Sequence, residues 1–186
     1  NLHYAFHNMG FNVLHLLPIL PSGRLNRLGS AGSVYAPSTY HEINPEYNTP
    51  GNGMSVFEEF QHFIRAAHER GIHVMVDIPS CASEDLAEAP PETIAVDEYG
   101  RRLTPGDWID IVAFANNQAF QDYMEPFFDL MNRAGVDGFR CDVARYRSDE
   151  FWQHFIDKYP EKGWFAESYV EEDDSPVMNI PRDRPW

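Results

Sequence analysis

One structural phrase occurs four times along this chain, and it constrains the fold more than any other feature. In each copy a helical pattern ends at a glycine, and a short apolar run follows at once. Glycine closes a helix readily because it adopts the left-handed backbone conformation without a Cβ clash. Helices that alternate with apolar strands indicate an α/β fold with a parallel sheet. The four apolar runs are residues 11–18, 72–77, 136–142 and 164–167.

The segments between the apolar runs carry helix signals. Residues 55–58 (SVFE) form a capping-box pattern, and apolar residues then recur every three or four positions. A second helix is expected after Asn116 or Asn117 and a third after Ser148, since Asn and Ser are preferred N-cap residues. Pro126 lies inside the second helical pattern, where proline kinks or breaks a helix.

Two connections are too long to be simple turns. They cover residues from about 18 to 53 and from about 79 to 116, and each follows the end of an apolar run. Long loops inside a compact domain are usually functional, and in parallel α/β folds such loops build the substrate site. Within the second connection, residues 94–103 have the pattern of a small hairpin that turns near Gly100.

Composition narrows the class of protein. The 186-residue chain is 43% hydrophobic, which is enough for one packed domain. Its net charge of −15 argues against nucleic acid as a partner, because phosphates need basic patches. No apolar stretch approaches the length of a membrane span, so we expect no membrane partner. None of these features indicates a localisation.

Two carboxylates stand where two neighbouring strands are expected to end. Asp142 ends residues 138–142 (GFRCD), and Glu167 ends the next apolar run along the chain. Side chains alternate faces along a strand, so Arg140 and Asp142 share a face. We expect the Arg140 guanidinium to hold Asp142 ionised and to orient it. Such a pair can split a glycosidic bond, with Asp142 as nucleophile and Glu167 as general acid and base.

Other chemistries have weaker support. A structural ion pair is the main alternative for Arg140 and Asp142, since ion-pair networks also perturb pKa values. The eight histidines show no metal-ligand spacing. The two cysteines, Cys81 and Cys141, fit neither a zinc site nor a disulfide framework. No serine has a placed histidine and aspartate, which disfavours a serine hydrolase.

Residues 138–144 (GFRCDVA) resemble the nucleophile motif of the alpha-amylase superfamily, which reads glycine, phenylalanine, arginine, any residue and aspartate. Glu167 follows Asp142 by twenty-five positions, where that family carries its acid/base glutamate. Residues 11–21 and 74–77 resemble the second and third barrel strands. The resemblance covers essentially the whole chain and implies a (β/α)8 TIM barrel, of which this chain holds strands two to five.

The resemblance also implies further site residues. Tyr35 matches the tyrosine that stacks on the sugar at the cleavage point, and Asp77 ends the third-strand motif, where it supports the site or the strand end. Arg145 and Tyr146 occupy positions that in many amylases are lysine and histidine and hold the leaving side of the glucan. Asp110 resembles the short motif before the fourth unit.

Two departures from the family pattern bear on metal binding. Cys81 and Ala82 stand where the family usually has an asparagine that often binds calcium and a histidine that contacts the sugar. We therefore expect no cofactor, and calcium binding that is absent or weak. The segments around Tyr35 and Asp77 are most similar to bacterial maltosyltransferases of the superfamily, which also lack this pair.

The activity that the resemblance implies is a retaining double displacement on an α-glucan or maltooligosaccharide. The two carboxyl groups should then lie about 5–5.5 Å apart. With water as acceptor the enzyme is a hydrolase, and with a sugar hydroxyl it is a transglycosylase such as a maltosyltransferase. A non-catalytic carbohydrate-binding relative is the alternative from another class.

The resemblance also implies an incomplete barrel. The family's third essential carboxylate lies on the seventh strand, outside this chain, and a complete barrel takes about 250 residues. We therefore expect residues 1–186 to be a partial catalytic barrel, with a long loop insertion from about 79 to 116. We expect this fragment to be inactive alone and to need the remainder of the barrel as its partner.

Overall fold

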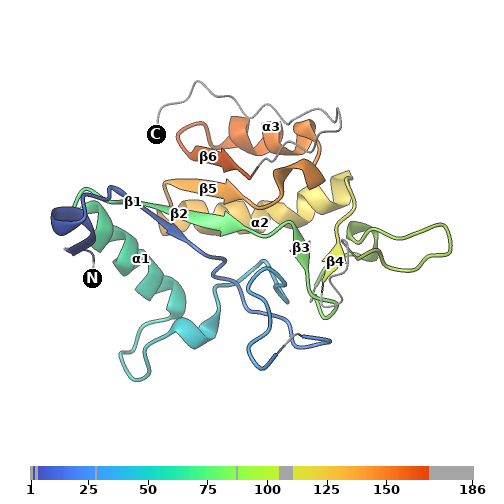
Figure 1. Cartoon of the computed structure of the whole chain (residues 1–186), viewed down its shortest axis with the longest axis horizontal. Coiled ribbons are helices and arrows are strands. Elements are labelled where there is room, and N and C mark those ends of the chain that lie inside the picture. The colour runs from blue at the N-terminus through green and yellow to red at the C-terminus, as the bar shows by residue number, and fades with distance from the viewer. Residues whose placement is uncertain (1, 3, 28, 87, 105–110, 168–186) are drawn as a thin grey trace.

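The computed structural model describes residues 2, 4–27, 29–86, 88–104 and 111–167. Its central feature is a four-stranded parallel sheet (Figure 1). In spatial order the strands are β1 (Val13–Leu16), β2 (His73–Ile78), β5 (Gly138–Cys141) and β6 (Gly163–Ala166). Each strand overlaps one of the four apolar runs, so the parallel sheet predicted from the repeat is confirmed.

Within the described residues, three α-helices connect the strands, and α2 lies between α1 and α3 in Figure 1. Their bounds are Val56–His68 for α1, Gln118–Ala134 for α2 and Asp149–Lys158 for α3. Ser55 caps α1 within a complete capping box, while Asn117 caps α2 and Ser148 caps α3. In each case the cap side chain accepts a hydrogen bond from a backbone N–H of the first turn, as the sequence predicts.

Pro126 does not break α2, which runs as one helix through it. A proline inside a helix removes one hydrogen bond and costs about 3 kcal/mol. Burial of each large apolar side chain contributes about 1.5–3 kcal/mol, so the packed face of this helix outweighs that cost. The buried side chains of α2 are those of Phe120, Tyr123, Met124, Phe127, Phe128, Met131 and Ala134.

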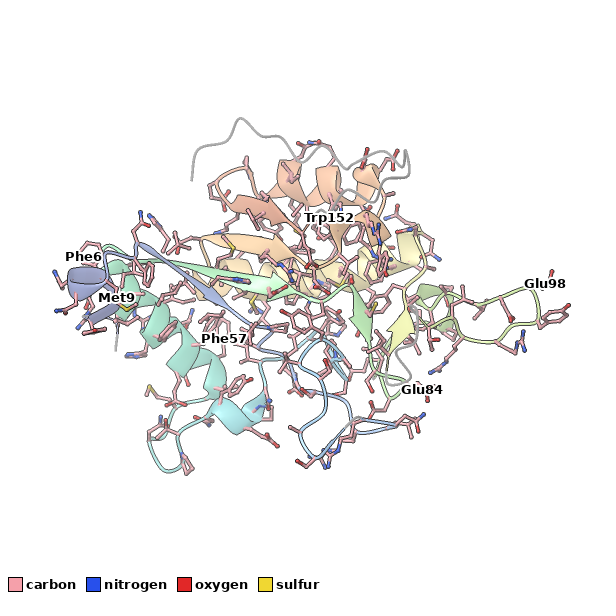
Figure 2. All side chains as sticks on the ribbon, viewed as in Figure 1. Phe6, Met9, Phe57, Glu84, Glu98 and Trp152 are labelled. Carbon is pink, nitrogen blue, oxygen red and sulfur yellow. The ribbon has the colours of Figure 1, made fainter. Side chains whose placement is uncertain are left out.

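The core lies between the sheet and the helices. Phe139 of β5 is completely buried, and its ring contacts Phe128 of α2 and Trp164 of β6 at centroid distances of 5.2 and 4.9 Å. Trp152 of α3, labelled in Figure 2, lies near Trp164, with ring centroids 6.5 Å apart. Because Phe139 faces the helices, Arg140 faces the opposite side of the sheet, as strand parity predicts.

The two long connections contain short elements of their own. The second includes an antiparallel pair of two-residue strands and a bridge between Val96 and Arg102, so the predicted hairpin is present. Gly100 takes φ 77° in its turn, and Glu98 lies at the projecting end of this segment (Figure 2). The remaining elements are η1 (Tyr4–Asn8), η2 (Pro45–Tyr47), β3 (Cys81–Ala82), η3 (Pro91–Thr93), β4 (Val112–Ala113) and η4 (Ala144–Tyr146).

The sheet is open at both sides in the described part of the chain. β1 pairs only with β2, and β6 pairs only with β5. Phe165 is paired in register with Arg140, so it shares the face of Arg140, and it is 55% exposed. Among the described residues, no helix is both long enough and apolar enough to cross a bilayer.

Candidate active site

One guanidinium holds three carboxylates together at the end of the sheet. Nη1 of Arg140 donates to Oδ1 of Asp142 at 2.8 Å and to both oxygens of Asp77, at 3.1 and 2.9 Å. Nη2 of Arg140 lies 2.8 Å from Oε1 of Glu167. The predicted contact between Arg140 and Asp142 is therefore confirmed. The three carboxylates come from three adjacent strands or the residues that directly follow them.

Strand register explains why these groups meet. Asp77 of β2 pairs with Arg140 of β5. The backbone N–H of Asp142 donates to the carbonyl of Ile78 at 3.0 Å, and that of Glu167 donates to the carbonyl of Cys141 at 2.9 Å. The parallel ladder thus continues one residue past β5 and β6. This continuation places Asp142 and Glu167 side by side at the carboxyl ends of neighbouring strands.

Asp77 is the innermost of the three carboxylates, and its side chain has no exposed surface. It accepts hydrogen bonds from Arg140 and, at 2.9 Å, from the Tyr35 hydroxyl. Its Oδ2 also lies 3.2 Å from Nε2 of His15. A buried carboxylate is stable only when it is paired in this way. Burial, together with the charge of Asp77, raises the pKa of Tyr35 to about 12, so its hydroxyl keeps the proton that it donates.

His15 contacts Asp77, although no metal-ligand or catalytic motif distinguishes it from the other seven histidines in the sequence. The signal was strand parity, because His15 pairs in register with Met75, two residues before Asp77 on the same face. Only the arrangement of β1 beside β2 brings the ring of His15 to Asp77.

Asp142 differs from expectation in its protonation. Burial raises its pKa to about 6, and the charges of Asp77 and Glu167 add to this rise, while the Arg140 guanidinium opposes it. The Arg140 guanidinium contacts Asp142 and favours its ionised form, as expected, but the effect of burial on the pKa is larger. Desolvation is the larger effect because the side chain is only 17% exposed. About nine-tenths of such a group is ionised at pH 7.

Glu167 is the most exposed carboxylate of the cluster, at 37% of its side-chain surface. Its Oε2 accepts a hydrogen bond from the backbone N–H of Val143 at 2.9 Å. Val143 takes the left-handed conformation, with φ 39° and ψ 54°. This conformation is unfavourable for a β-branched residue, so the chain is strained directly after Asp142. The strained turn aims the Val143 N–H at Glu167.

The other predicted site residues lie beside the carboxylate cluster. Arg145 and Tyr146 belong to η4, which follows Asp142 and Val143, and the Arg145 guanidinium lies 5.9 Å from the Tyr146 ring centre. Arg145 is exposed, whereas Tyr146 packs against a small buried cluster that includes Cys81. Their predicted contacts with the leaving side of a glucan stay predictions. Asp110 lies outside the described residues.

Within the described ranges, no three histidine, cysteine or acidic side chains are grouped so that they could hold a metal ion. Cys81 and Ala82 form β3 and are both buried. Weak or absent calcium binding stays a prediction, and so does the carboxyl separation of about 5–5.5 Å.

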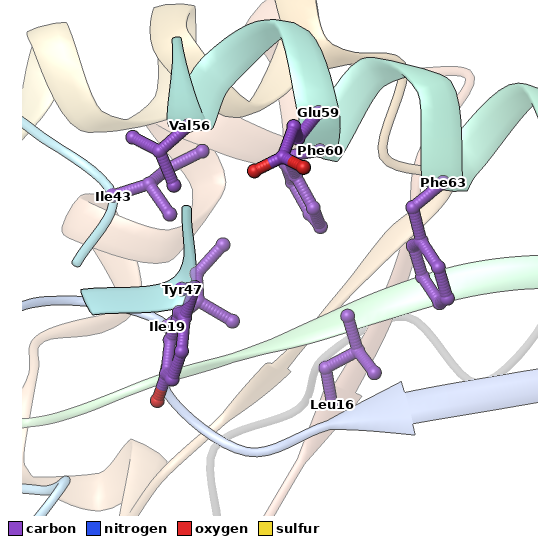
Figure 3. A pocket seen from close by; sticks show the side chains of 8 residues that line it. All are labelled: Leu16, Ile19, Ile43, Tyr47, Val56, Glu59, Phe60 and Phe63. Carbon is purple, nitrogen blue, oxygen red and sulfur yellow. The ribbon is translucent and has the colours of Figure 1, made fainter. Parts of the chain in front are cut away.

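A pocket of about 370 Å³ lies away from this cluster, between β1, α1 and the segment around η2 (Figure 3). Figure 3 shows a single carboxylate, that of Glu59, among its otherwise largely apolar side chains. The carboxylate cluster around Arg140 contributes no residue to its lining. The lining residues are Leu16, Ile19, Ile43, Tyr47, Val56, Glu59, Phe60 and Phe63.

Comparison with known proteins identifies relatives, although no protein-family model matches the chain. The alpha-1,4-glucan:maltose-1-phosphate maltosyltransferase of Bifidobacterium animalis subsp. lactis is 28% identical over 87% of the chain. An alpha-amylase structure from Lactobacillus plantarum is 36% identical over 88% of the chain, with a TM-score of 0.74. A maltogenic alpha-amylase from Thermotoga neapolitana is 30% identical over 88%, with a TM-score of 0.73. The chain spans 25% of that maltosyltransferase and 39% of each amylase structure.

Proposed function

We propose that this chain, a member of the alpha-amylase superfamily close to its maltosyltransferases, is part of the catalytic domain of a retaining enzyme that acts on α-linked glucans. The observation that carries the proposal is the Arg140 bridge between Asp142 and Glu167 at the ends of adjacent parallel strands. We assign residues 1–186 to a partial (β/α) barrel, with residues from about 79 to 116 as an insertion after β2.

In the first half of the reaction, Asp142 attacks the anomeric carbon and the glycosidic bond breaks. Glu167 gives its proton to the leaving oxygen, and a glycosyl ester forms on Asp142. In the second half, Glu167 takes a proton from the acceptor, which displaces Asp142 from the sugar. Two inversions leave the anomeric configuration unchanged.

The resting contacts define what must change when substrate binds. Both oxygens of Glu167 accept hydrogen bonds, from Arg140 and from the backbone of Val143. A general acid needs a proton on the oxygen that faces the leaving group, so one of these two contacts opens in the reactive complex. Oδ1 of Asp142 still accepts the hydrogen bond from Arg140, so Oδ2 is the more available oxygen for attack.

The supporting roles follow from the same contacts. Asp77 anchors Arg140 from the buried side of the cluster, and Tyr35 and His15 hold Asp77. Tyr35 also presents its ring to the sugar, and Arg145 and Tyr146 contact the leaving or acceptor side. The substrate is an α-glucan or maltooligosaccharide.

A transglycosylase is the second candidate, because the curated relatives include maltosyltransferases. The two candidates share every step up to the glycosyl ester and differ in whether water or a sugar hydroxyl accepts.

Further parallel strands pair with the open sides of β1 and β6 and complete the barrel. They also cover Phe165, which is 55% exposed on the face of Arg140.

The experiment is an assay of the protein encoded by the complete open reading frame, with maltooligosaccharides in the presence and absence of a sugar acceptor. Hydrolysis or transfer that is lost in both Asp142→Asn and Glu167→Gln supports the proposal. Products longer than the starting oligosaccharide identify a transferase. A protein that binds the oligosaccharide without turnover is instead a non-catalytic relative.

A further inference from the structure

Three successive carbonyl groups, directly after β2, are held from outside by two buried side chains. The Tyr40 hydroxyl shares its proton between the carbonyl oxygens of Pro79 and Cys81, each 2.8 Å away. Nη2 of Arg147 donates to the carbonyl between them, that of Ser80, at 3.2 Å. A loop with all three carbonyls fixed has little freedom to rotate its peptide planes.

Tyr40 and Arg147, which hold these carbonyls and are together called the clamp, are themselves fixed in place. Tyr40 is completely buried, and burial raises its pKa well above the ordinary value, so it stays a donor. Arg147 is only 4% exposed, and burial lowers its pKa to about 10. Its Nη1 donates to the carbonyl of Phe114 at 3.1 Å, and its guanidinium lies 5.0 Å from the ring centre of Phe120.

The clamped segment ends on the proposed nucleophile. Ser80 is 5% exposed, and its hydroxyl donates to Oδ2 of Asp142 at 3.3 Å. Arg140 holds the other oxygen, Oδ1, at 2.8 Å. The longer bond to Ser80 is the weaker of the two. Asp142 is therefore oriented by two donors, one from its own strand and one from the loop after β2.

We propose that Ser80 is a positioning residue for Asp142, and that Tyr40 and Arg147 hold the Ser80 segment in place for it. The inference rests on the proposed function, which identifies Asp142 as the nucleophile. The contact between Ser80 and Asp142 is present in the structure whatever the function. During attack by Oδ2 the Ser80 bond gives way to the new bond to carbon. A weak donor suits this step because it orients the oxygen without competing strongly for its lone pair.

A hydrogen bond to the ionised form of a carboxyl lowers its pKa, so Ser80 opposes the effect of burial on Asp142. The other groups around Asp142 set the background against which this contribution is measured. They are Asp77 of β2, Arg140 and Cys141 of β5, Glu167 after β6, Tyr35, Tyr40 and Cys81 of the two long connections, and His15 of β1 on the far side of Asp77.

The test is a pH titration of the Asp142 carboxyl carbon by NMR, in the full-length protein labelled with ¹³C-aspartate. Loss of the signal in Asp142→Asn assigns the resonance. Ser80→Ala should raise the titration midpoint by about 0.5 pH units, since one donor to the ionised form is lost. Ser83→Ala is the matched control, because this serine is also buried but donates to Asp85 at 2.5 Å.

Arg147→Lys tests the clamp, since one ammonium cannot replace the fork that reaches both Ser80 and Phe114. It should shift the midpoint in the same direction, and the double variant with Ser80→Ala should shift it no further than Ser80→Ala alone. Tyr40→Phe is a second test of the clamp, because it removes only the hydroxyl that donates to Pro79 and Cys81.

An unchanged midpoint in Ser80→Ala would overturn the inference. An additive shift in the double variant would overturn the part in which Arg147 acts through Ser80. The titration needs no turnover, so the test of Ser80 can fail or succeed independently of the test of the proposed function. A shifted midpoint in a protein without activity supports Ser80 and contradicts the catalytic proposal, whereas an active protein with an unshifted midpoint does the reverse.

Discussion

Nη2 of Arg140 lies 2.8 Å from Oε1 of Glu167, although Glu167 is the most exposed acid in the cluster. The same side chain uses Nη1 to hold two further carboxylates, so a single positive charge serves three negative ones. This relationship makes Arg140 the residue on which the assembly of the site depends.

Arg140→Met should therefore destabilise the fold strongly. It leaves the completely buried Asp77 without its cation, and loss of one partner of a buried pair costs about 3–5 kcal/mol. Urea denaturation at pH 7 measures this. Arg101→Met is the control, because the Arg101 side chain is 74% exposed and loss of its surface pair with Asp97 should cost far less. Equal effects of the two substitutions would show that the cluster is not a stabilising centre.

The rate of the enzyme should fall as Asp142 becomes protonated. Burial raises the pKa of Asp142 to about 6, and only the ionised form attacks carbon. The plot of kcat/KM against pH should therefore have an acid limb with its midpoint near pH 6. A limb near pH 4, the ordinary value for aspartate, would contradict the buried environment described for this group.

The pH dependence of stability that Asp142 contributes should be opposite in sign to that of an ordinary salt-bridged aspartate, whose contribution is lost as the pH falls. Its pKa is raised in the folded state, so between about pH 4 and pH 6 the folded protein binds more protons than the unfolded chain at this site. This contribution to the free energy of unfolding grows as the pH falls through that window. Asp142→Asn should remove it, so the variant should gain stability relative to wild type at pH 7 and lose that advantage near pH 4.5. Paired denaturation curves at the two pH values measure the difference.

Much of this arrangement could be predicted from local pattern, because local chemistry determines it. The cap at Ser55 depends on residues three positions apart, and the shared face of Arg140 and Asp142 depends only on strand alternation. The pKa of Asp142 and the contacts of Ser80 could not be predicted in this way. They depend on how residues sixty or more positions away fold over the ends of the strands, and no short-range pattern reports that burial.

The strained turn after Asp142 offers a stability test. Val143 has φ 39°, where a β-branched residue costs about 1–2 kcal/mol and asparagine is far better tolerated. Val143→Asn should raise the free energy of unfolding by about 0.5–1 kcal/mol, as measured by denaturation. Val136→Asn, at a completely buried position, is the contrasting case and should be destabilising. Loss of stability in Val143→Asn as well would mean that packing, not backbone strain, dominates there.

Calcium should bind weakly or not at all. Cys81 stands at the position where the family usually has its calcium-binding asparagine, and this thiol is buried. Titration of the metal-free full-length protein by calorimetry checks this, with magnesium as the comparison. Submicromolar affinity for calcium would place the protein among high-affinity calcium binders and contradict the expectation.

Residues 1–186 alone should show no turnover of maltooligosaccharides. The sheet is open at β1 and β6, and Phe165 is exposed beside Arg140, so fixed orientation of a sugar needs further strands. Parallel assays of this segment and of the complete reading frame test the point. Turnover by the segment that disappears in Asp142→Asn would show that these strands suffice.

The central claim is that Asp142 forms a covalent bond to the sugar, and mass spectrometry of a trapped intermediate tests it most directly. The Glu167→Gln variant of the full-length protein should be incubated with an α-maltosyl fluoride, whose leaving group needs no acid, so that the ester forms but is removed slowly. The account predicts one maltosyl adduct on the peptide that contains Asp142, and none after Asp142→Asn. Release of fluoride with the adduct on another residue, or with no adduct and an inverted product, would contradict it.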